Sequence, residues 1–168
     1  MELRAANAAD AAGITLIYND AVTNTTAIWN DFTVDAANRI AWMADREAQG
    51  FPVLVAMEAG EVLGYASYGT WRAIDGFRRT VEHSVYVSAQ ARGRGVGVAL
   101  MEALIAEAKT RGVHVMVAAI DASNAVSIRL HERLGFRQTG VMPQVGMKFG
   151  RWLDLAFLQL QLDDAPNP

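Results

Sequence analysis

The segment Gln90-Ala91-Arg92-Gly93-Arg94-Gly95-Val96-Gly97 constrains this chain more than any other part of its sequence. It follows a run of β-forming residues that ends at Val87, and it precedes an apolar pattern of helical spacing from Gly95 to about Arg111. A loop of small residues that leads into a helix can aim several backbone N–H groups at one anion, and the helix dipole favours negative charge there. The segment therefore predicts a strand, a loop and a helix that together bind a pyrophosphate.

A glycine-rich turn before a helix also occurs as a plain tight turn, so the surrounding sequence has to decide. A dinucleotide-binding fold would need a parallel βαβ unit near the start of the chain, whereas this loop lies in mid-chain after a hairpin meander. A Walker-type loop would need Gly-Lys-Ser/Thr, which is absent. Arg92 and Arg94 add cations beside glycines that let an anion approach the backbone, which favours a phosphate site of another kind.

Hydrophobic periodicity predicts a mixed α/β domain around one sheet, neither doubly wound nor a repeat. The expected order is strand, helix, helix, three strands, helix, strand, helix and two strands. These elements are 2–5, 8–23, 34–49, 52–57, 62–71, 80–87, 95–111, 113–120, 124–134, 137–144 and 152–162. Thr33 or Asp35 can cap the second helix, and Ala59-Gly60 is a hairpin turn. Alternation in the last strand predicts that one of its faces is buried.

Length, composition and net charge limit the number of domains, the partners and the location that we expect for this protein. With 168 residues, 52% of them hydrophobic, the chain can bury one core, so we expect a single domain, residues 1–168, with 163–168 as a loose tail. A net charge of −3 argues against a nucleic-acid partner. The sequence lacks a secretory signal and an apolar stretch of about 18 residues, so we expect a cytoplasmic protein without a membrane partner. Without cysteine there is no disulfide and no thiolate nucleophile.

The stretch from Glu82 to Phe136 resembles the acyl-CoA core of the GNAT N-acetyltransferases. The motifs that carry the resemblance occur in order: VYV, QARGRGVG, a helix, a strand ending in Ala-Ile, NAVS and LGF. Over nearly the whole chain, the strings TWRAIDGFRRTVEHSVYV, HVMVAAIDASNAVSIRLHERLGF and GVMPQVGMKFGRWLDLAFLQLQL are similar to the phosphinothricin and methionine-sulfoximine acetyltransferase branch. The methionine-sulfoximine type is favoured because TVEHSVYV, MPQVG and KFGRWLD are preserved.

The resemblance implies a GNAT fold, that is, one mixed and mostly antiparallel β-sheet splayed at its central strands and flanked by helices. It also implies acetyl-CoA as cosubstrate, a homodimer, and direct transfer within a ternary complex. The acceptor would be the α-amino group of a small amino-acid analogue such as L-methionine sulfoximine, L-methionine sulfone or phosphinothricin. The cofactor-binding residues implied are Val85, Tyr86, Val87, Arg92, Gly93, Arg94, Gly95, Val96, Gly97, Val98, Asn124 and Ser127. Asn124 is equally suited to be a helix N-cap.

Three residues are expected to act in catalysis. An α-amino group is largely protonated at neutral pH and has to lose a proton before it attacks, and the resemblance gives this task to Glu82, directly or through one water. Alternatively, the Glu82 carboxylate only pairs with Arg78 or Arg79. The resemblance also implies that the Val87 N–H stabilises the negative charge that develops on the thioester oxygen. His131 stands where many family members have a tyrosine acid, but a lone histidine on a helix is often structural.

The amino-acid pocket implied by the resemblance comprises Arg72, Ala73, Ile74, Glu82, His83 and Ser84. Arg72 is our first choice for the substrate α-carboxylate, because a guanidinium matches it in geometry. Trp71, Phe77 and His83 are candidate walls. Trp29 and Phe32 either belong to the site or serve in the core or a dimer contact. The three histidines lack metal-ligand spacing, so no metal is expected.

Two other functions share the cofactor core. A protein or peptide N-terminal acetyltransferase would need an open groove for the peptide. A catalytically idle CoA-binding regulatory module would keep the glycine-rich loop alone, although the retained Glu82 and the arginines of the 72–79 segment speak against it. An aminoglycoside acceptor is disfavoured, because a polycation calls for an acidic pocket and this segment is basic.

Overall fold

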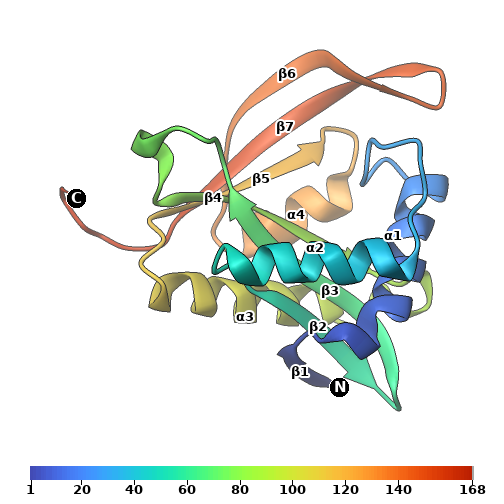
Figure 1. Cartoon of the computed structure of the whole chain (residues 1–168). Coiled ribbons are helices and arrows are strands. Elements are labelled where there is room, and N and C mark those ends of the chain that lie inside the picture. The colour runs from blue at the N-terminus through green and yellow to red at the C-terminus, as the bar shows by residue number, and fades with distance from the viewer. Residues whose placement is uncertain (168) are drawn as a thin grey trace. The chain divides into compact units, whose positions relative to one another are not determined.

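A computed structural model of the chain describes residues 1–167 (Figure 1). The described residues form seven strands, four α-helices and three short 3-10 helices. The strands are β1 Glu2–Ala5, β2 Val53–Glu58, β3 Glu61–Thr70, β4 Thr80–Val87, β5 Val115–Asp121, β6 Arg137–Lys148 and β7 Arg151–Gln161. The α-helices are α1 Ala11–Asn24, α2 Ala36–Ala48, α3 Val96–Thr110 and α4 Ala125–Arg133. The 3-10 helices are Ala8–Asp10, Asp75–Phe77 and Ala89–Ala91.

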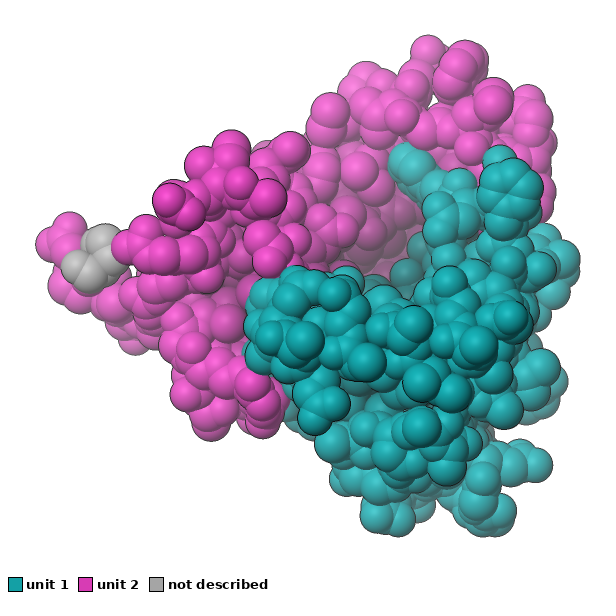
Figure 2. Space-filling model, in the orientation of Figure 1, with its two compact units in different colours: residues 1–68, 84–104 teal, residues 69–83, 105–168 magenta. Residues whose placement is uncertain are grey.

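The strand order is β1-β2-β3-β4-β5-β7-β6, which confirms the single mixed sheet of the predicted fold class. β4 and β5 are parallel, whereas the pairs β1–β2, β2–β3, β5–β7 and β6–β7 are antiparallel. The chain forms two compact units, residues 1–68 with 84–104 and residues 69–83 with 105–168, coloured separately in Figure 2. Strand β4 contributes to both units, because the division falls between His83 and Ser84. The predicted splay of the central strands stays a prediction.

The core of the first unit lies between α1 and the strands β2 and β3. Ile14 and Ile17, one turn apart on α1, are buried against Val55 and Tyr65. Asp35 caps α2 as one of the two predicted caps, because its carboxylate accepts a hydrogen bond from the Asn38 N–H at 2.8 Å. The β2–β3 hairpin turns at Ala59-Gly60 as predicted, with φ of 49° and 84°.

The second unit holds β5, β7 and β6, and in Figure 1 the last two strands form a long twisted hairpin. The alternation predicted for the end of β7 is confirmed: Leu158 is buried, Leu160 is half-buried and Leu162, directly after the strand, is buried, whereas Gln159 and Gln161 are exposed. The β6 strand is longer than predicted, because it continues past Gln144 to Lys148. The sequence pattern after Gln144 does not predict this extension.

An irregular stretch explains the missed part of β6. Gln144 has a φ of 55°, and the β6–β7 register shifts between Met142 and Gly146. The Gln144 N–H is held by the Asp154 carboxylate at 2.8 Å, so a side chain replaces a ladder contact. Pro143, which lies inside this stretch, also lacks the N–H that a regular strand would use.

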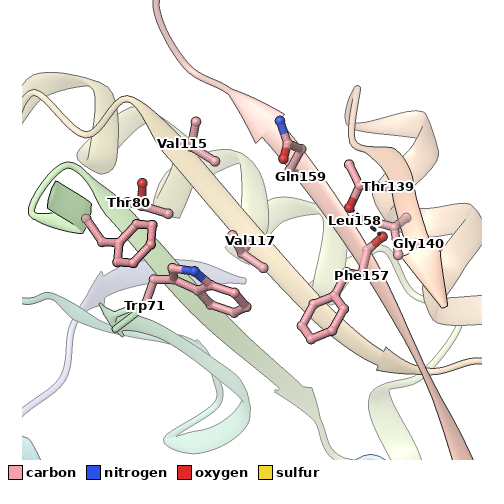
Figure 3. Close-up of a pocket in the computed structure, with 10 residues that line it drawn as sticks. Trp71, Thr80, Val115, Val117, Thr139, Gly140, Phe157, Leu158 and Gln159 are labelled. Atoms are coloured by element: carbon pink, nitrogen blue, oxygen red, sulfur yellow. Dashed lines mark hydrogen bonds between the residues drawn. The ribbon is translucent and has the colours of Figure 1, made fainter. Parts of the chain in front are cut away.

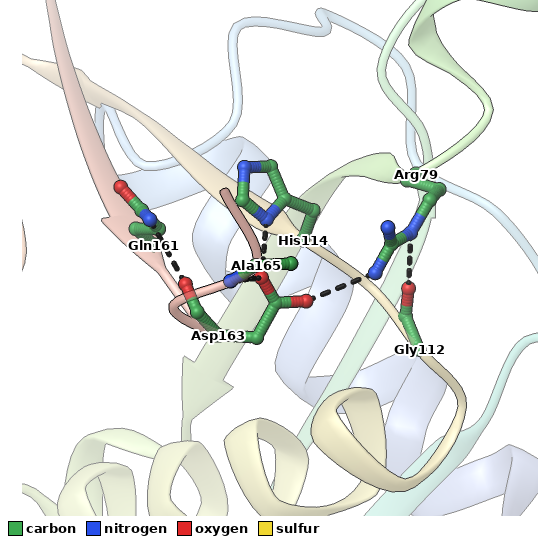
Figure 4. A network of polar contacts seen from close by, with 6 residues as sticks. All are labelled: Arg79, Gly112, His114, Gln161, Asp163 and Ala165. Atoms are coloured by element: carbon green, nitrogen blue, oxygen red, sulfur yellow. Dashed lines mark hydrogen bonds and ion pairs between the residues drawn. The ribbon is translucent and has the colours of Figure 1, made fainter. Parts of the chain in front are cut away.

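The first residue of the predicted tail is tied to the second unit (Figure 4). One Asp163 carboxylate oxygen lies 2.6 Å from His114 Nδ1 and the other lies 2.9 Å from the Arg79 guanidinium. Arg79 also donates to the Gly112 carbonyl at 2.9 Å. Asp163 therefore joins the segment before β4, the start of β5 and the end of β7.

Candidate active site

The glycine-rich loop of the first unit has the backbone that a phosphate site requires. Gly93 and Gly95 have φ of 76° and 80°, and an added Cβ at either position would meet only open space. The first α3 hydrogen bond runs from the Ala99 N–H to the Gly95 carbonyl, so the N–H groups of Val96, Gly97 and Val98 have no acceptor within the helix. The residues present therefore fit the pyrophosphate of a CoA thioester.

The two arginines of this loop already have acidic partners. The Arg92 guanidinium lies 3.2 Å from the Asp20 carboxylate, and Arg94 forms an ion pair with Glu58. Arg94 lowers the pKa of the Glu58 carboxyl. Because both arginine side chains stay about half exposed, each can still turn toward a phosphate, at the cost of a weak surface ion pair.

Strand β4 separates its side chains onto two faces. Thr80 and Glu82 share one face, whereas Val81 and His83 lie on the other and are buried. Glu82 is half-buried, and this burial raises the pKa of its carboxyl above 4.5, while the nearby Arg72 charge opposes the rise. A carboxylate with a raised pKa in a partly dry site is suited to accept a proton.

The alternative role predicted for Glu82, pairing with Arg78 or Arg79, does not occur among the described residues. Arg78 donates to the Asp75 carbonyl at 3.1 Å, and Arg79 binds Asp163 and the Gly112 carbonyl. The electrostatic neighbour of Glu82 is instead Arg72, whose guanidinium stacks 5.0 Å above the Trp71 ring.

His83 and His131 form a buried pair in the second unit. Their Nε2 atoms are 3.0 Å apart, their rings stack with an interplanar angle of 17°, and Phe136 packs edge-on against both. His131 Nδ1 lies 2.7 Å from the Ser127 carbonyl and so carries the proton, which makes its Nε2 the acceptor for the His83 Nε2–H. Burial lowers the pKa of both rings, that of His83 to about 3, so both are neutral at pH 7.

This tautomer assignment leaves His131 without a proton aimed at a substrate, which favours a structural role over the predicted general acid. His83 was predicted as a wall of the amino-acid pocket, but its ring contacts α4 and Phe136, on the strand face opposite Glu82. Asn124 caps α4, because its side-chain oxygen accepts from the Ser127 N–H at 3.1 Å.

A pocket of about 440 Å³ lies in the second unit, and one of its lining residues, Thr80, is on the same face of β4 as Glu82 (Figure 3). Its lining residues are Trp71, Phe77, Thr80, Val115, Val117, Thr139, Gly140, Phe157, Leu158 and Gln159. The predicted walls Trp71 and Phe77 are both among them, and the Trp71 ring packs edge-to-face on Phe157 with centroids 5.6 Å apart. The exposed residues Arg72, Ala73 and Ile74 follow Trp71 directly. The predicted substrate segment therefore borders a real cavity.

The far side of this pocket, formed by Thr139, Phe157 and Gln159, is not predicted by the sequence pattern. The alternation of β7 placed Gln159 on the exposed face, but no local signal showed that this face borders a cavity. The remaining predicted site residues, Ser84 to Val87, form the half-buried second part of β4 in the first unit. Of the two aromatic residues predicted between α1 and α2, Phe32 is 84% exposed, which excludes a core role.

The sequence profile of the Acetyltransferase (GNAT) family matches residues 14–136. The chain belongs to the GNAT acetyltransferase family. It is 64% identical to the L-methionine sulfoximine/L-methionine sulfone acetyltransferase of Pseudomonas aeruginosa over 162 residues, which cover 96% of this chain and 94% of the relative. It is also 37% identical to a phosphinothricin N-acetyltransferase of Alcaligenes faecalis over 92% of this chain and 79% of the relative. The predicted branch is thereby confirmed.

Solved GNAT structures confirm the fold. A putative acetyltransferase from Salmonella typhimurium, solved with its cofactor acetyl-CoA, superposes with a TM-score of 0.97 at 59% identity, covering 99% of this chain and 96% of that one. A ribosomal-protein-alanine N-acetyltransferase from Brucella melitensis superposes with a TM-score of 0.94 at 53% identity, covering 96% of this chain and 99% of that one.

Residues 1–167 contain no group of three or more histidine, aspartate or glutamate side chains placed to hold a metal ion. Within the same residues, no helix has the length and apolar character needed to cross a membrane.

Proposed function

We propose that this GNAT enzyme transfers the acetyl group of acetyl-CoA to the α-amino group of small amino acids such as L-methionine sulfone and L-methionine sulfoximine. One observation carries the proposal: Glu82, half-buried and with a raised pKa, lies on the same strand face as the pocket residue Thr80 and near Arg72. An amino-acid acceptor needs a base for its amine and a cation for its carboxylate, and this arrangement supplies both.

In the proposed reaction, the Glu82 carboxylate takes one proton from the ammonium group, directly or through a water. The freed amine attacks the thioester carbonyl, so that a C–N bond forms and the C–S bond breaks within a ternary complex. The Val87 N–H, five residues further along β4, donates to the carbonyl oxygen as it gains negative charge. As the C–S bond breaks, the nitrogen loses its second proton and the departing thiolate takes up one proton. Because the conjugate acid of the thiolate has a pKa of about 8.5, a weak acid is enough.

The cofactor contacts are proposed in two groups. The first comprises the glycine-rich loop and the start of α3, Arg92 to Val98, for the pyrophosphate, with Val85 to Val87 along the pantetheine arm. The second comprises Asn124 and Ser127. Asn124 and Ser127 are held together by the N-cap hydrogen bond between them, which fixes the start of α4. His131 as general acid stays a prediction, which its hydrogen bonds do not favour.

We also propose that residues 1–168 form a single domain, that the protein is cytoplasmic, and that two copies of the chain form a homodimer. Support comes from the β6–β7 hairpin, which exposes six large apolar side chains by 45–64%: Val141, Met142, Val145, Met147, Phe149 and Trp152. Large apolar side chains that are exposed together on one hairpin favour an interaction surface there. Sedimentation analysis tests the dimer, and a monomer at micromolar concentration would contradict it.

The function is tested by CoA-thiol release from acetyl-CoA with a panel of acceptors. The panel comprises L-methionine sulfone, L-methionine sulfoximine, phosphinothricin, ordinary amino acids and a short peptide. Turnover with the sulfone and sulfoximine is the expected result.

The same panel tests the alternatives. Turnover with the peptide alone would move the function to protein N-terminal acetylation, which the name of the Brucella melitensis structure brings into consideration. Acetyl-CoA binding without any turnover would favour an idle CoA-binding module.

A further inference from the structure

Resting on the function above, we infer that the pocket on the Glu82 face of β4 binds the substrate side chain, and that Gln159 selects side chains that are uncharged and end in a hydrogen-bond acceptor. Neither the family resemblance nor the sequence motifs assign Gln159 a role. The pocket, the strand register and the chemistry of the lining carry this inference.

The strand register places Gln159 opposite the proposed base. Glu82 pairs with Val117 across the parallel β4–β5 ladder, and Val117 pairs with Gln159 across the antiparallel β5–β7 ladder. Residues in register carry their side chains on the same face of a sheet. Neighbouring strands lie about 4.8 Å apart, so the backbones of Glu82 and Gln159 are separated by about 10 Å, with Val117 between them. An amino acid whose amine meets Glu82 can extend its side chain over Val117 toward Gln159.

Three groups thus surround one amino acid. Glu82 faces the amine, and Arg72 marks the carboxylate end from its place over the Trp71 ring. Trp71 and Phe157, in edge-to-face contact, wall the cavity into which the side chain would enter. The rings provide apolar surface for methylene groups, while the pocket volume of about 440 Å³ leaves room for the bulky end of a methionine sulfone.

The lining determines which side-chain ends are accepted. It includes no charged residue, and its polar side chains are Thr80, Thr139 and Gln159. The Thr139 hydroxyl already donates to the Phe157 carbonyl at 3.3 Å, whereas the Gln159 carboxamide is exposed in the pocket (Figure 3). An amide N–H can donate to a sulfone or sulfoximine oxygen. A phosphinate anion would find no cation here, so phosphinothricin should be a poorer substrate.

The test compares kcat/KM for methionine sulfone, norleucine and phosphinothricin in Gln159→Leu and Gln159→Arg. Norleucine matches the sulfone in chain length but has no oxygen at its end. Gln159→Leu should lower the sulfone-to-norleucine ratio roughly five- to tenfold, because one neutral hydrogen bond is lost. Gln159→Arg should raise the phosphinothricin-to-sulfone ratio about tenfold or more, because a charged hydrogen bond is gained.

Gln161→Leu and Gln161→Arg are the matched controls. Gln161 lies two residues further along the same exposed face of β7, is not part of the pocket lining, and donates to the Asp163 carbonyl. The control variants should leave both ratios within about twofold of the unsubstituted enzyme. Unchanged ratios in the Gln159 variants, or equal shifts in the Gln161 variants, would overturn the inference. An unsubstituted enzyme that acetylates none of the three amino acids would instead refute the proposed function.

Gly140 offers a second way to test the pocket. It pairs with Phe157 in the β6–β7 ladder, and a Cβ added there would meet no atom within 4 Å. Gly140→Leu should therefore fold and partly fill the cavity, lowering kcat/KM for methionine sulfone about tenfold or more. A variant with an unchanged melting temperature and unchanged kcat/KM would contradict a side-chain site in this pocket.

Discussion

His83 on β4 and His131 on α4 meet through their Nε2 atoms at 3.0 Å, and one hydrogen bond from His131 to the Ser127 carbonyl fixes the tautomers of both. The pair joins the strand that carries Glu82 to the helix that Asn124 caps. Both rings are buried and neutral, so protonation of either ring would place a charge in the protein interior. The stability of the contact therefore depends on pH.

We predict that this pair makes the fold sensitive to mild acid. Both histidines have a folded pKa below the ordinary 6.5, so below pH 6.5 the unfolded chain binds protons that the folded chain does not. The stabilisation is present above pH 6.5 and is lost as the pH falls toward about 3. As the pH falls from 6.5 to 4.5, His83 alone should lower the free energy of unfolding by about 2 kcal/mol.

Denaturant unfolding across this range measures the effect. The double variant His83→Leu, His131→Leu should show a flatter pH dependence than the unsubstituted enzyme. Its kcat at pH 7 also tests the role of His131: a decrease of less than about tenfold fits a structural role, whereas a loss of about 100-fold or more would support the predicted general acid. Equal slopes in both proteins would refute the neutral pair.

Replacing the proposed base should affect catalysis far more than folding. Glu82→Gln should lower kcat/KM at pH 7 by about 100- to 1,000-fold, because general base catalysis contributes at this scale. The melting temperature should hardly change, since no described residue forms an ion pair with Glu82. CoA-thiol release measures the activity, and near-normal turnover would exclude Glu82 as the base.

The pH profile of kcat gives an independent test of Glu82. A base acts only when deprotonated, so activity should rise as the pH rises through a Glu82 pKa that burial places above 4.5. Arg72 opposes that rise in pKa, and Arg72→Gln should therefore move the acid limb to higher pH. The same variant should raise KM for the amino acid. An acid limb at unchanged pH in Arg72→Gln would show that the Arg72 charge does not affect the pKa of Glu82.

The glycine-rich loop can be tested at one backbone position. Gly95 has a φ of 80°, and an Ala there strains the backbone and puts a methyl group where the phosphate would approach. Gly95→Ala should raise KM for acetyl-CoA about tenfold. Gly112→Ala is the control, since Gly112 has a φ of 71° and equally open surroundings at the other end of α3. A similar KM increase in both variants would point to a general loss of stability.

The Asp163 contacts should stabilise the fold only above acid pH. His114, the Ala165 N–H and Arg79 lower the pKa of the Asp163 carboxyl below 3.8. Their contribution is present above pH 3.8 and disappears as the pH falls through the lowered pKa. Asp163→Asn should reduce the melting temperature at pH 7 by about 1–3 °C, as expected for an exposed network, and by less at pH 3. An equal decrease at both values would exclude the ionic origin.

Features encoded by neighbouring residues were predictable from the sequence. Thr80–Val87 matches β4 at both ends, Asp35 and Asn124 take cap positions that their residue types favour, and Gly60 takes a turn position with a positive φ that suits glycine. The loop before α3 was predicted for the same reason, because its glycines and the helix that follows are adjacent in the chain.

Features that depend on tertiary contacts were not predictable in this way. The His83–His131 pair joins residues 48 positions apart, and no local pattern shows that His83 turns away from Glu82 toward α4. The β6 extension depends on the Asp154 side chain of the facing strand. The role inferred for Gln159 follows from the register of two ladders, which alternation within β7 alone cannot give.

The proposed function is the transfer of an acetyl group from acetyl-CoA to an α-amino group. The most direct test incubates the enzyme with L-methionine sulfone and acetyl-CoA carrying a ¹³C label in its acetyl group, and identifies the product by mass spectrometry and NMR. We expect one labelled acetyl group on the α-nitrogen, formed with an equal amount of free CoA and nearly absent with Glu82→Gln. Free CoA without an acetylated amino acid, or undiminished product with Glu82→Gln, would contradict it.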